Sequence, residues 1–275
     1  MDISKSKEKR PEKGRKKKDT KRIGLIKINE SMQKIENNNN RKKEAMIITS
    51  HFEKTDPNLS NVSKSICKIK IETPSETIYG TGFLLRFYIE QEPFYCLISN
   101  EHVISEDIIN NKNTINISYD SGFKSKNIKL DQNKRYIKTF MDIDLDITIV
   151  EIIEEDDIFR DYFLYDESEE RINNELINMN IYAPQYAEGK DLKNAKGIIK
   201  EINNYEFAHS VSTLNGSSGS PIILENSIYV IGIHKEGDEV KLENYGDFIY
   251  PAINRIKEDI RKTRDKGKYI NGKYI

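Results

Sequence analysis

A serine in a glycine-rich turn is the residue of this chain best suited to act as a nucleophile. Ser218 has Gly216 two residues before it and Gly219 directly after it, and an apolar segment begins at Pro221. An attacking hydroxyl needs a sharp turn that exposes its Oγ, and nearby backbone N–H groups that stabilise the oxyanion. Glycine allows both positive φ and the close approach of a substrate. The same residues also fit a plain hairpin, because Gly and Ser are common in turns.

A nucleophilic serine needs a base, and four histidines are available in the chain: His51, His102, His209 and His234. His102 follows the apolar segment 94–99, where a side chain can emerge at the rim of a barrel. A histidine at such a rim can also be purely structural. His51 lies in a predicted linker, and His209 is expected to be structural. The pattern therefore favours His102 as the base.

An orienting carboxylate is expected where a buried strand begins. The segment 142–150, Asp-Ile-Asp-Leu-Asp-Ile-Thr-Ile-Val, offers three aspartates. Asp146 directly precedes the apolar run, so we expect it to be partly buried and to fix the tautomer of a histidine. Asp144 remains an alternative because it has the same strand parity.

The order of these residues along the chain separates the classes of serine hydrolase. His102, Asp146 and Ser218 follow one another as in chymotrypsin, whereas α/β-hydrolases run Ser, Asp, His and subtilisins run Asp, His, Ser. The chain resembles trypsin-like (chymotrypsin-fold) serine peptidases, and within them it is most similar to glutamyl endopeptidases and related bacterial-type enzymes. The matching pieces are Gly-Thr-Gly-Phe-Leu-Leu at 80–85, Ile-Ser-Asn-Glu-His-Val-Ile at 98–104, Asp-Ile-Thr-Ile-Val at 146–150, Gly-Ser-Ser-Gly-Ser-Pro at 216–221 and Val-Ile-Gly-Ile-His at 230–234. They extend over residues 65–262.

The resemblance implies an all-β fold, with two six-stranded antiparallel β-barrels and a catalytic cleft between them. It assigns Ser218 as nucleophile, His102 as general base and then acid, and Asp146 as the residue that orients the histidine. The backbone N–H groups of Gly216 and Ser218 would form the oxyanion hole.

The resemblance also implies a substrate pocket. Thr213 and His234 match the pair that binds an acidic P1 side chain in glutamyl endopeptidases, and their donors could satisfy a buried carboxylate. His234 could instead merely cap a barrel strand. Secreted trypsin-like enzymes have an acid directly before the nucleophile that pairs with a freed N-terminus. Ser217 occupies that position here and cannot form the ion pair.

Short alternating segments predict the strands that must position these residues. The predicted strands are 66–71, 78–88, 94–99, 114–119, 124–130, 135–139 and 146–152, then 179–182, 195–202, 207–212, 221–224, 228–233 and 247–250. Ile253, Ile256 and Ile260 share one face of a predicted C-terminal helix over 252–261. The predicted domains are a disordered basic arm at 1–45, a linker at 46–64, an N-terminal barrel at 65–153, a C-terminal barrel and helix at 171–262, and a tail at 263–275. The acidic stretch between the barrels, 154–170, is expected to be a solvated connection.

Composition indicates a soluble protein with a basic N-terminal arm. Residues 1–44 contain 16 Lys/Arg and 7 Asp/Glu, a net charge of +9, so the remainder carries −10 of the total of −1. Cys67 and Cys96 lie in apolar segments and are expected to be buried thiols in a reducing compartment. The first residues lead into charge rather than an apolar run, and no apolar run approaches the length of a membrane span. We expect a cytoplasmic protein, or a nuclear one if the arm directs import.

The sequence thus predicts a serine endopeptidase that acts on protein or peptide substrates without cofactor or metal. The alternative is a protease-fold binding module that the arm targets. Residues 5–22 could bind an acidic partner, an import receptor or nucleic acid without sequence specificity, or could be a solvated tail.

Overall fold

The computed structural model describes residues 59–111, 113–166, 174–225, 227–238, 240–265, 269–270 and 273–274, all within the unit Lys43–Ile275. The predicted basic arm, the first part of the predicted linker and residues 167–170 of the acidic stretch lie outside these residues. So do most residues of the predicted tail, although the short strands β15 (Tyr269–Ile270) and β16 (Lys273–Tyr274) pair with each other there.

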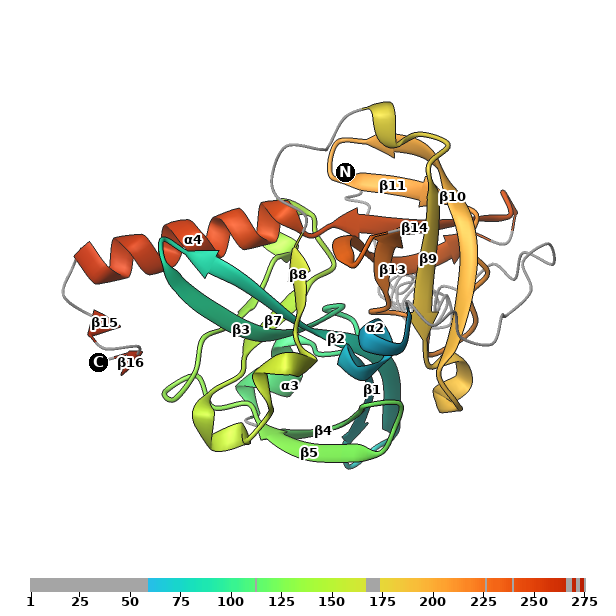
Figure 1. Cartoon of the computed structure of the whole chain (residues 1–275). Helices are drawn as coiled ribbons and strands as arrows, with labels where there is room; N and C mark the ends of the chain where they lie inside the picture. The colour runs from blue at the N-terminus through green and yellow to red at the C-terminus, as the bar shows by residue number, and fades with distance from the viewer. Residues whose placement is uncertain are drawn as a thin grey trace, which may run out of the picture. The chain divides into compact units, whose positions relative to one another are not determined.

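The N-terminal half is a strongly curled antiparallel sheet (Figure 1). Its strands are β1 (Ile66–Glu72), β2 (Thr77–Ile89), β3 (Glu92–Ser99), β4 (Thr114–Tyr119), β5 (Lys124–Lys129), β6 (Ile137–Thr139) and β7 (Thr148–Glu151). The pairing order is β5–β4–β1–β2–β3–β7–β6. Alternate residues of these strands point inward, so that Ile69, Ile115 and Ile117 belong to one apolar core that Ile108 and Ile109 of the short helix α3 (Glu106–Asn110) complete.

The C-terminal half is a closed six-stranded antiparallel barrel. Its strands are β9 (Asn180–Gln185), β10 (Lys193–Asn203), β11 (Glu206–His209), β12 (Pro221–Leu224), β13 (Tyr229–Asp238) and β14 (Glu243–Phe248). They pair in the ring β9–β10–β11–β14–β13–β12, and β12 returns to β9. Closure leaves no sheet edge around the ring and encloses a core that includes Ile199, Phe207 and Ile222.

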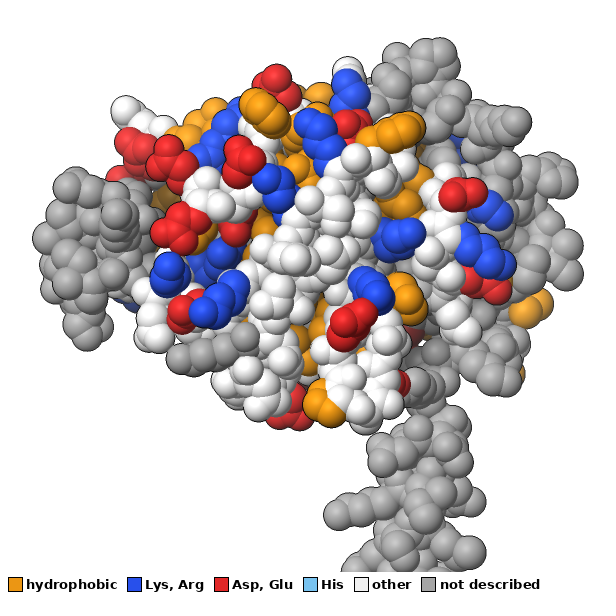
Figure 2. Space-filling model, turned by 90° about the horizontal axis from the view of Figure 1, so that it is seen from below, with side chains coloured by type: hydrophobic (Ala, Val, Ile, Leu, Met, Phe, Trp, Pro, Cys, Tyr) orange, Lys and Arg blue, Asp and Glu red, His pale blue; other side chains and the backbone are white. Residues whose placement is uncertain are grey.

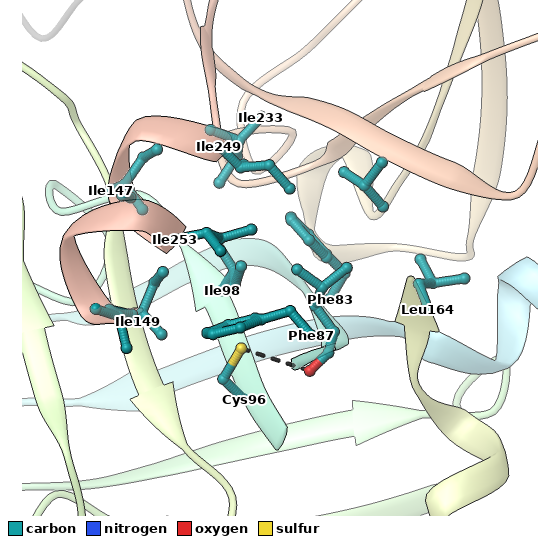
Figure 3. Close-up of a cluster of buried hydrophobic side chains, with 14 of the residues drawn as sticks. Phe83, Phe87, Cys96, Ile98, Ile147, Ile149, Leu164, Ile233, Ile249 and Ile253 are labelled. Atoms are coloured by element: carbon teal, nitrogen blue, oxygen red, sulfur yellow. Dashed lines mark hydrogen bonds between the residues drawn. The ribbon is translucent and has the colours of Figure 1, made fainter. Parts of the chain in front are cut away.

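A third apolar cluster joins the two halves. It contains Phe83 and Ile98 of the N-terminal sheet, Ile233 of the C-terminal barrel and Ile253 of the helix α4 (Tyr250–Asp265) (Figure 3). The short strand β8 (Leu164–Asp166) adds to this connection, because it pairs in parallel with both β2 and β13. The N-terminal sheet and the C-terminal barrel therefore share a packed interface, which fixes the loops that meet there.

The structure confirms the predicted all-β class with one C-terminal helix. The C-terminal barrel has the predicted six strands. The N-terminal half has seven, and among the described residues β5 and β6 do not pair to close it. Elements that the pattern did not predict are α2 (Leu59–Ser65), α3, β8, β15, β16 and five 3-10 turns: η1 (Met141–Ile143), η2 (Glu154–Asp156), η3 (Arg160–Tyr162), η4 (Asn174–Leu176) and η5 (Ala187–Gly189).

Surface features follow the composition of this unit. Figure 2 shows acidic and basic side chains interspersed over one face, without a large area of one sign. Cys67 and Cys96 are both buried, free thiols. Within the part of the chain that the structure describes, no helix is both long and apolar enough to cross a membrane.

Candidate active site

His102 lies in a turn directly after β3, at the rim of the N-terminal sheet. The carbonyl of Asn100 accepts hydrogen bonds from the N–H groups of Val103 (3.2 Å) and Ile104 (3.0 Å), which curls the chain around His102. The His102 side chain is 46% exposed, so its ring is accessible. The fully buried Asn100 donates through its Nδ2 to the carbonyl of Asp146 at 2.7 Å. This side-chain bond joins the histidine turn to the aspartate segment.

Asp146 faces His102 two residues before β7. Its Oδ2 lies 2.6 Å from His102 Nδ1, and its Oδ1 accepts from the backbone N–H of His102 at 3.1 Å. Burial alone would raise the pKa of Asp146, but the hydrogen bonds and charge of His102 outweigh it and hold that pKa below its usual value. Asp144, the other candidate for the orienting acid, is exposed. Its backbone is left-handed (φ 58°), and it ends η1. The structure thus pairs Asp146 with the histidine.

The turn that carries Ser218 is internally bonded and pressed against the N-terminal sheet. Ser217 is fully buried; its N–H donates to the Leu214 carbonyl at 2.9 Å, and its Oγ accepts from the Leu214 N–H at 3.1 Å. Gly219 has φ +91°, and a Cβ there would lie 1.9 Å from the Thr81 carbonyl oxygen and 2.6 Å from Ser99 Oγ. Since Ser99 is only three residues before His102, this close approach brings the serine turn to the histidine turn.

Two peptide groups of the turn are held by partners on other elements. The N–H of Glu188 in η5 donates to the Asn215 carbonyl at 2.5 Å. In a trans peptide the N–H points opposite to the C=O, so this bond directs the Gly216 N–H away from η5. Thr81 Oγ1 donates to the Gly216 carbonyl at 2.7 Å and accepts from the Tyr186 N–H at 3.0 Å. The backbone geometry of the predicted oxyanion donor is therefore fixed from two sides.

The predicted pocket residues are both buried, and His234 is paired with His209. The Val211 N–H donates to His209 Nδ1 (3.2 Å), and His209 Nε2 lies 3.2 Å from His234 Nδ1. Burial, followed by the nearby His234, holds the pKa of His209 well below its usual value, so His209 is neutral. Because its Nδ1 accepts, its Nε2 carries the proton, which has both the Tyr245 backbone and His234 Nδ1 as neighbours.

Thr213 is fully buried, and its hydroxyl has no hydrogen-bond partner among the described residues. A buried hydroxyl without a partner is costly, which is consistent with a site that a ligand completes. Among the described residues, no cluster of three or more His, Cys, Asp or Glu side chains is arranged to hold a metal ion.

A solved structure of another protein has a similar fold, whereas comparisons of sequence give no match. No protein-family model matches the sequence, and no curated protein matches it. A serine endoprotease from Yersinia pestis is similar in structure, with a TM-score of 0.54 and 13% identity over 76% of this chain and 68% of that chain. Rv3671c from M. tuberculosis H37Rv, in an inactive form, has a TM-score of 0.49 and 15% identity, over 76% of this chain and 95% of that chain. Catalytically active tobacco etch virus protease, complexed with product, has a TM-score of 0.48 and 15% identity, over 71% of this chain and 77% of that chain.

The chain therefore has the trypsin/chymotrypsin-like serine protease fold. At 13% identity the likeness establishes the fold, and what the site does depends on its residues. Three residues of the site were not predicted from the sequence: Thr81, Asn100 and Asp247, whose carboxylate accepts from the Asp146 N–H at 2.8 Å. The only sequence signal was the position of Thr81 and Asn100 inside the matched segments.

Proposed function

We propose that the protein is a serine endopeptidase in which Ser218 is the nucleophile, His102 the general base and acid, and Asp146 the orienting acid. The observation that carries the proposal is the bond between His102 Nδ1 and Asp146 Oδ2 at 2.6 Å. A carboxylate on Nδ1 leaves Nε2 free of the proton in the resting tautomer, so Nε2 can take the proton of an attacking hydroxyl. The serine turn packs against Thr81 and against Ser99, three residues before His102, which supports Ser218 as the source of that proton.

In the proposed reaction, Ser218 Oγ attacks the scissile carbonyl carbon while His102 Nε2 takes its proton. The tetrahedral oxyanion accepts hydrogen bonds from the N–H groups of Gly216 and Ser218. His102 then gives its proton to the leaving amine, and the acyl-enzyme forms. Water hydrolyses that ester by the same steps in reverse order. Asp146 stays ionised and stabilises the imidazolium, in line with its lowered pKa.

Labelling with a fluorophosphonate tests this proposal. The wild-type protein should be labelled covalently, and Ser218→Ala should not, while both remain folded by circular dichroism. If the pure, folded protein is labelled no more than Ser218→Ala, the endopeptidase proposal fails and a protease-fold binding module remains.

For the substrate, we propose a preference for Glu or Asp at P1. The buried hydroxyl of Thr213 and the buried imidazole of His234 supply hydroxyl and ring N–H donors suited to a carboxylate. A P1 peptide library should show the preference in the wild type and its loss in His234→Ala. If the profile of His234→Ala is unchanged, the histidine only completes the barrel wall.

The basic segment 5–22 lies outside the described residues, so its acidic, import-receptor and nucleic-acid partners stay predictions, as does a cytoplasmic or nuclear location. The predicted division into an arm at 1–45, a linker at 46–64, a peptidase domain at 65–262 and a tail at 263–275 is likewise a proposal. Limited proteolysis that removes the arm without a change in labelling rate would support it.

A further inference from the structure

One buried carboxyl group beside the site has no role in the reaction described above. Asp247 lies on β14 and is 1% exposed. Its Oδ2 accepts a hydrogen bond from the backbone N–H of Asp146 at 2.8 Å. Burying a carboxylate is costly unless it is paired, so its presence at this position calls for a compensating benefit.

Three charged groups from three other parts of the fold face Asp247. Lys235 on β13 places its Nζ 3.6 Å from Asp247 Oδ1 and 3.0 Å from Oε2 of Glu206 on β11. Asp146, from the segment before β7, is the third. Burial raises the pKa of Asp247 to about 6, although Lys235 and the Asp146 N–H oppose the increase and the charges of Asp146 and Glu206 add to it. Two carboxyl groups thus lie behind His102: Asp146 contacts its ring, and Asp247 contacts Asp146.

We propose that Asp247 is a positioning residue for the pair of Asp146 and His102. Asp247 fixes the backbone of Asp146 and adds a second negative charge behind the Asp146 carboxylate. The catalytic meaning of this inference rests on the proposed function. Its electrostatic part concerns the imidazole of His102 and is measurable without turnover.

The positioning follows from the bonds on both backbone groups of Asp146. Its N–H is held by Asp247 and its carbonyl by Asn100 Nδ2 at 2.7 Å. With both ends of the residue fixed, the carboxylate keeps both of its contacts with His102. A site that must hold a donor and an acceptor in one geometry gains most when a second layer of bonds fixes them.

The charge acts in the same direction as the triad acid. When His102 takes the serine proton it becomes a cation, and an ionised Asp247 favours that cation. Lys235 opposes the effect in part. The ionised form of Lys235 is itself maintained by Asp247 and Glu206, which outweigh burial and raise its pKa. The four groups form one coupled unit behind the histidine.

The test is an NMR titration of His102 in the full chain labelled with ¹³C,¹⁵N-histidine, assigned by comparison with His102→Gln. Asp247→Asn keeps an acceptor for the Asp146 N–H but removes the charge. It should lower the pKa of His102 by about half a unit or more, the size expected for one nearby charge in a partly solvated site. Glu206→Gln is the matched control: it removes one charge from the same unit at a carboxylate that is 38% exposed and bonded to Lys235. Its shift should be much smaller.

A second measurement addresses the hydrogen bond between the Asp146 N–H and the Asp247 carboxylate. The rate constant for fluorophosphonate acylation should fall about tenfold or more in Asp247→Leu relative to Asp247→Asn, at a temperature where both are folded. If Asp247→Leu does not fold, the Asp247→Asn titration still decides. An unchanged His102 titration in folded Asp247→Asn, or an equal shift in Glu206→Gln, overturns the inference. A wild type that is not acylated, with the His102 shift present, refutes only the proposed function.

Discussion

Thr81→Val tests how the fold fixes the oxyanion donors. Valine keeps the shape of threonine but removes an Oγ1 that donates to the Gly216 carbonyl at 2.7 Å and accepts from the Tyr186 N–H at 3.0 Å. Thr81 is fully buried, so water cannot replace either partner. At about 1–1.5 kcal/mol for each bond, the loss of stability is about 2–3 kcal/mol. For a unit of this size that corresponds to a fall in Tm of about 5–10 °C.

The effect on activity should appear in kcat. In Thr81→Val the oxyanion donors are still present, but the Gly216 turn that positions them is less restrained. The loss of kcat should therefore be about 10–100-fold, smaller than the roughly 10²–10³ for removal of a donor, with KM nearly unchanged. Thr81→Ser, which keeps the hydroxyl, is the control and should retain kcat within about threefold. A Thr81→Val enzyme with wild-type kcat, or a Thr81→Ser enzyme equally impaired, would refute the reasoning.

Three further predictions concern the fit of Gly219, the effect of Asp247 on stability and the role of Asp146. Gly219→Ala should fail to fold, because its Cβ would lie 1.9 Å from the Thr81 carbonyl, whereas Gly122→Ala, at the similar φ of +89° but with nothing within 4 Å, should cost only about 1 kcal/mol in a urea titration. The pKa of Asp247 is raised to about 6, so the folded state loses stability as pH rises from about 4 to 6; Asp247→Asn should therefore be more stable than wild type by about 1–3 kcal/mol at pH 7.5, and a less stable variant would contradict this sign. Asp146→Asn should lower kcat by about 10⁴ without unfolding the protein, since the amide favours the wrong histidine tautomer, and a loss below tenfold would exclude Asp146 as the orienting acid.

Alternation of apolar residues was enough to predict most strands, including β4 and β12 at their observed bounds. β8 was not predictable, because three residues that lead into an acidic run become a strand only through tertiary pairing with β2 and β13. β13 extends five residues past the predicted end at residue 233, into the polar segment that follows His234, because its pairing with β14 continues there. Local pattern thus predicts strands that bury a face and misses strands defined by their partners.

The site shows the same division. The segment 142–150 left Asp144 and Asp146 both open, and the left-handed turn at Asp144 that separates them is a backbone feature with no sequence signature there. The bonds of Asp247 to Asp146 and of His209 to His234 span 101 and 25 residues, so residue types alone could not predict them. His209 was expected to be structural, and the structure places its Nε2 3.2 Å from His234 Nδ1.

Mass spectrometry of the adduct formed with a fluorophosphonate is the most direct test of Ser218 as the nucleophile. We expect one adduct per chain, located on the peptide that contains Ser218, with a rate that falls sharply in His102→Ala. An unmodified protein, an adduct on another residue, or an equal rate in His102→Ala would contradict it.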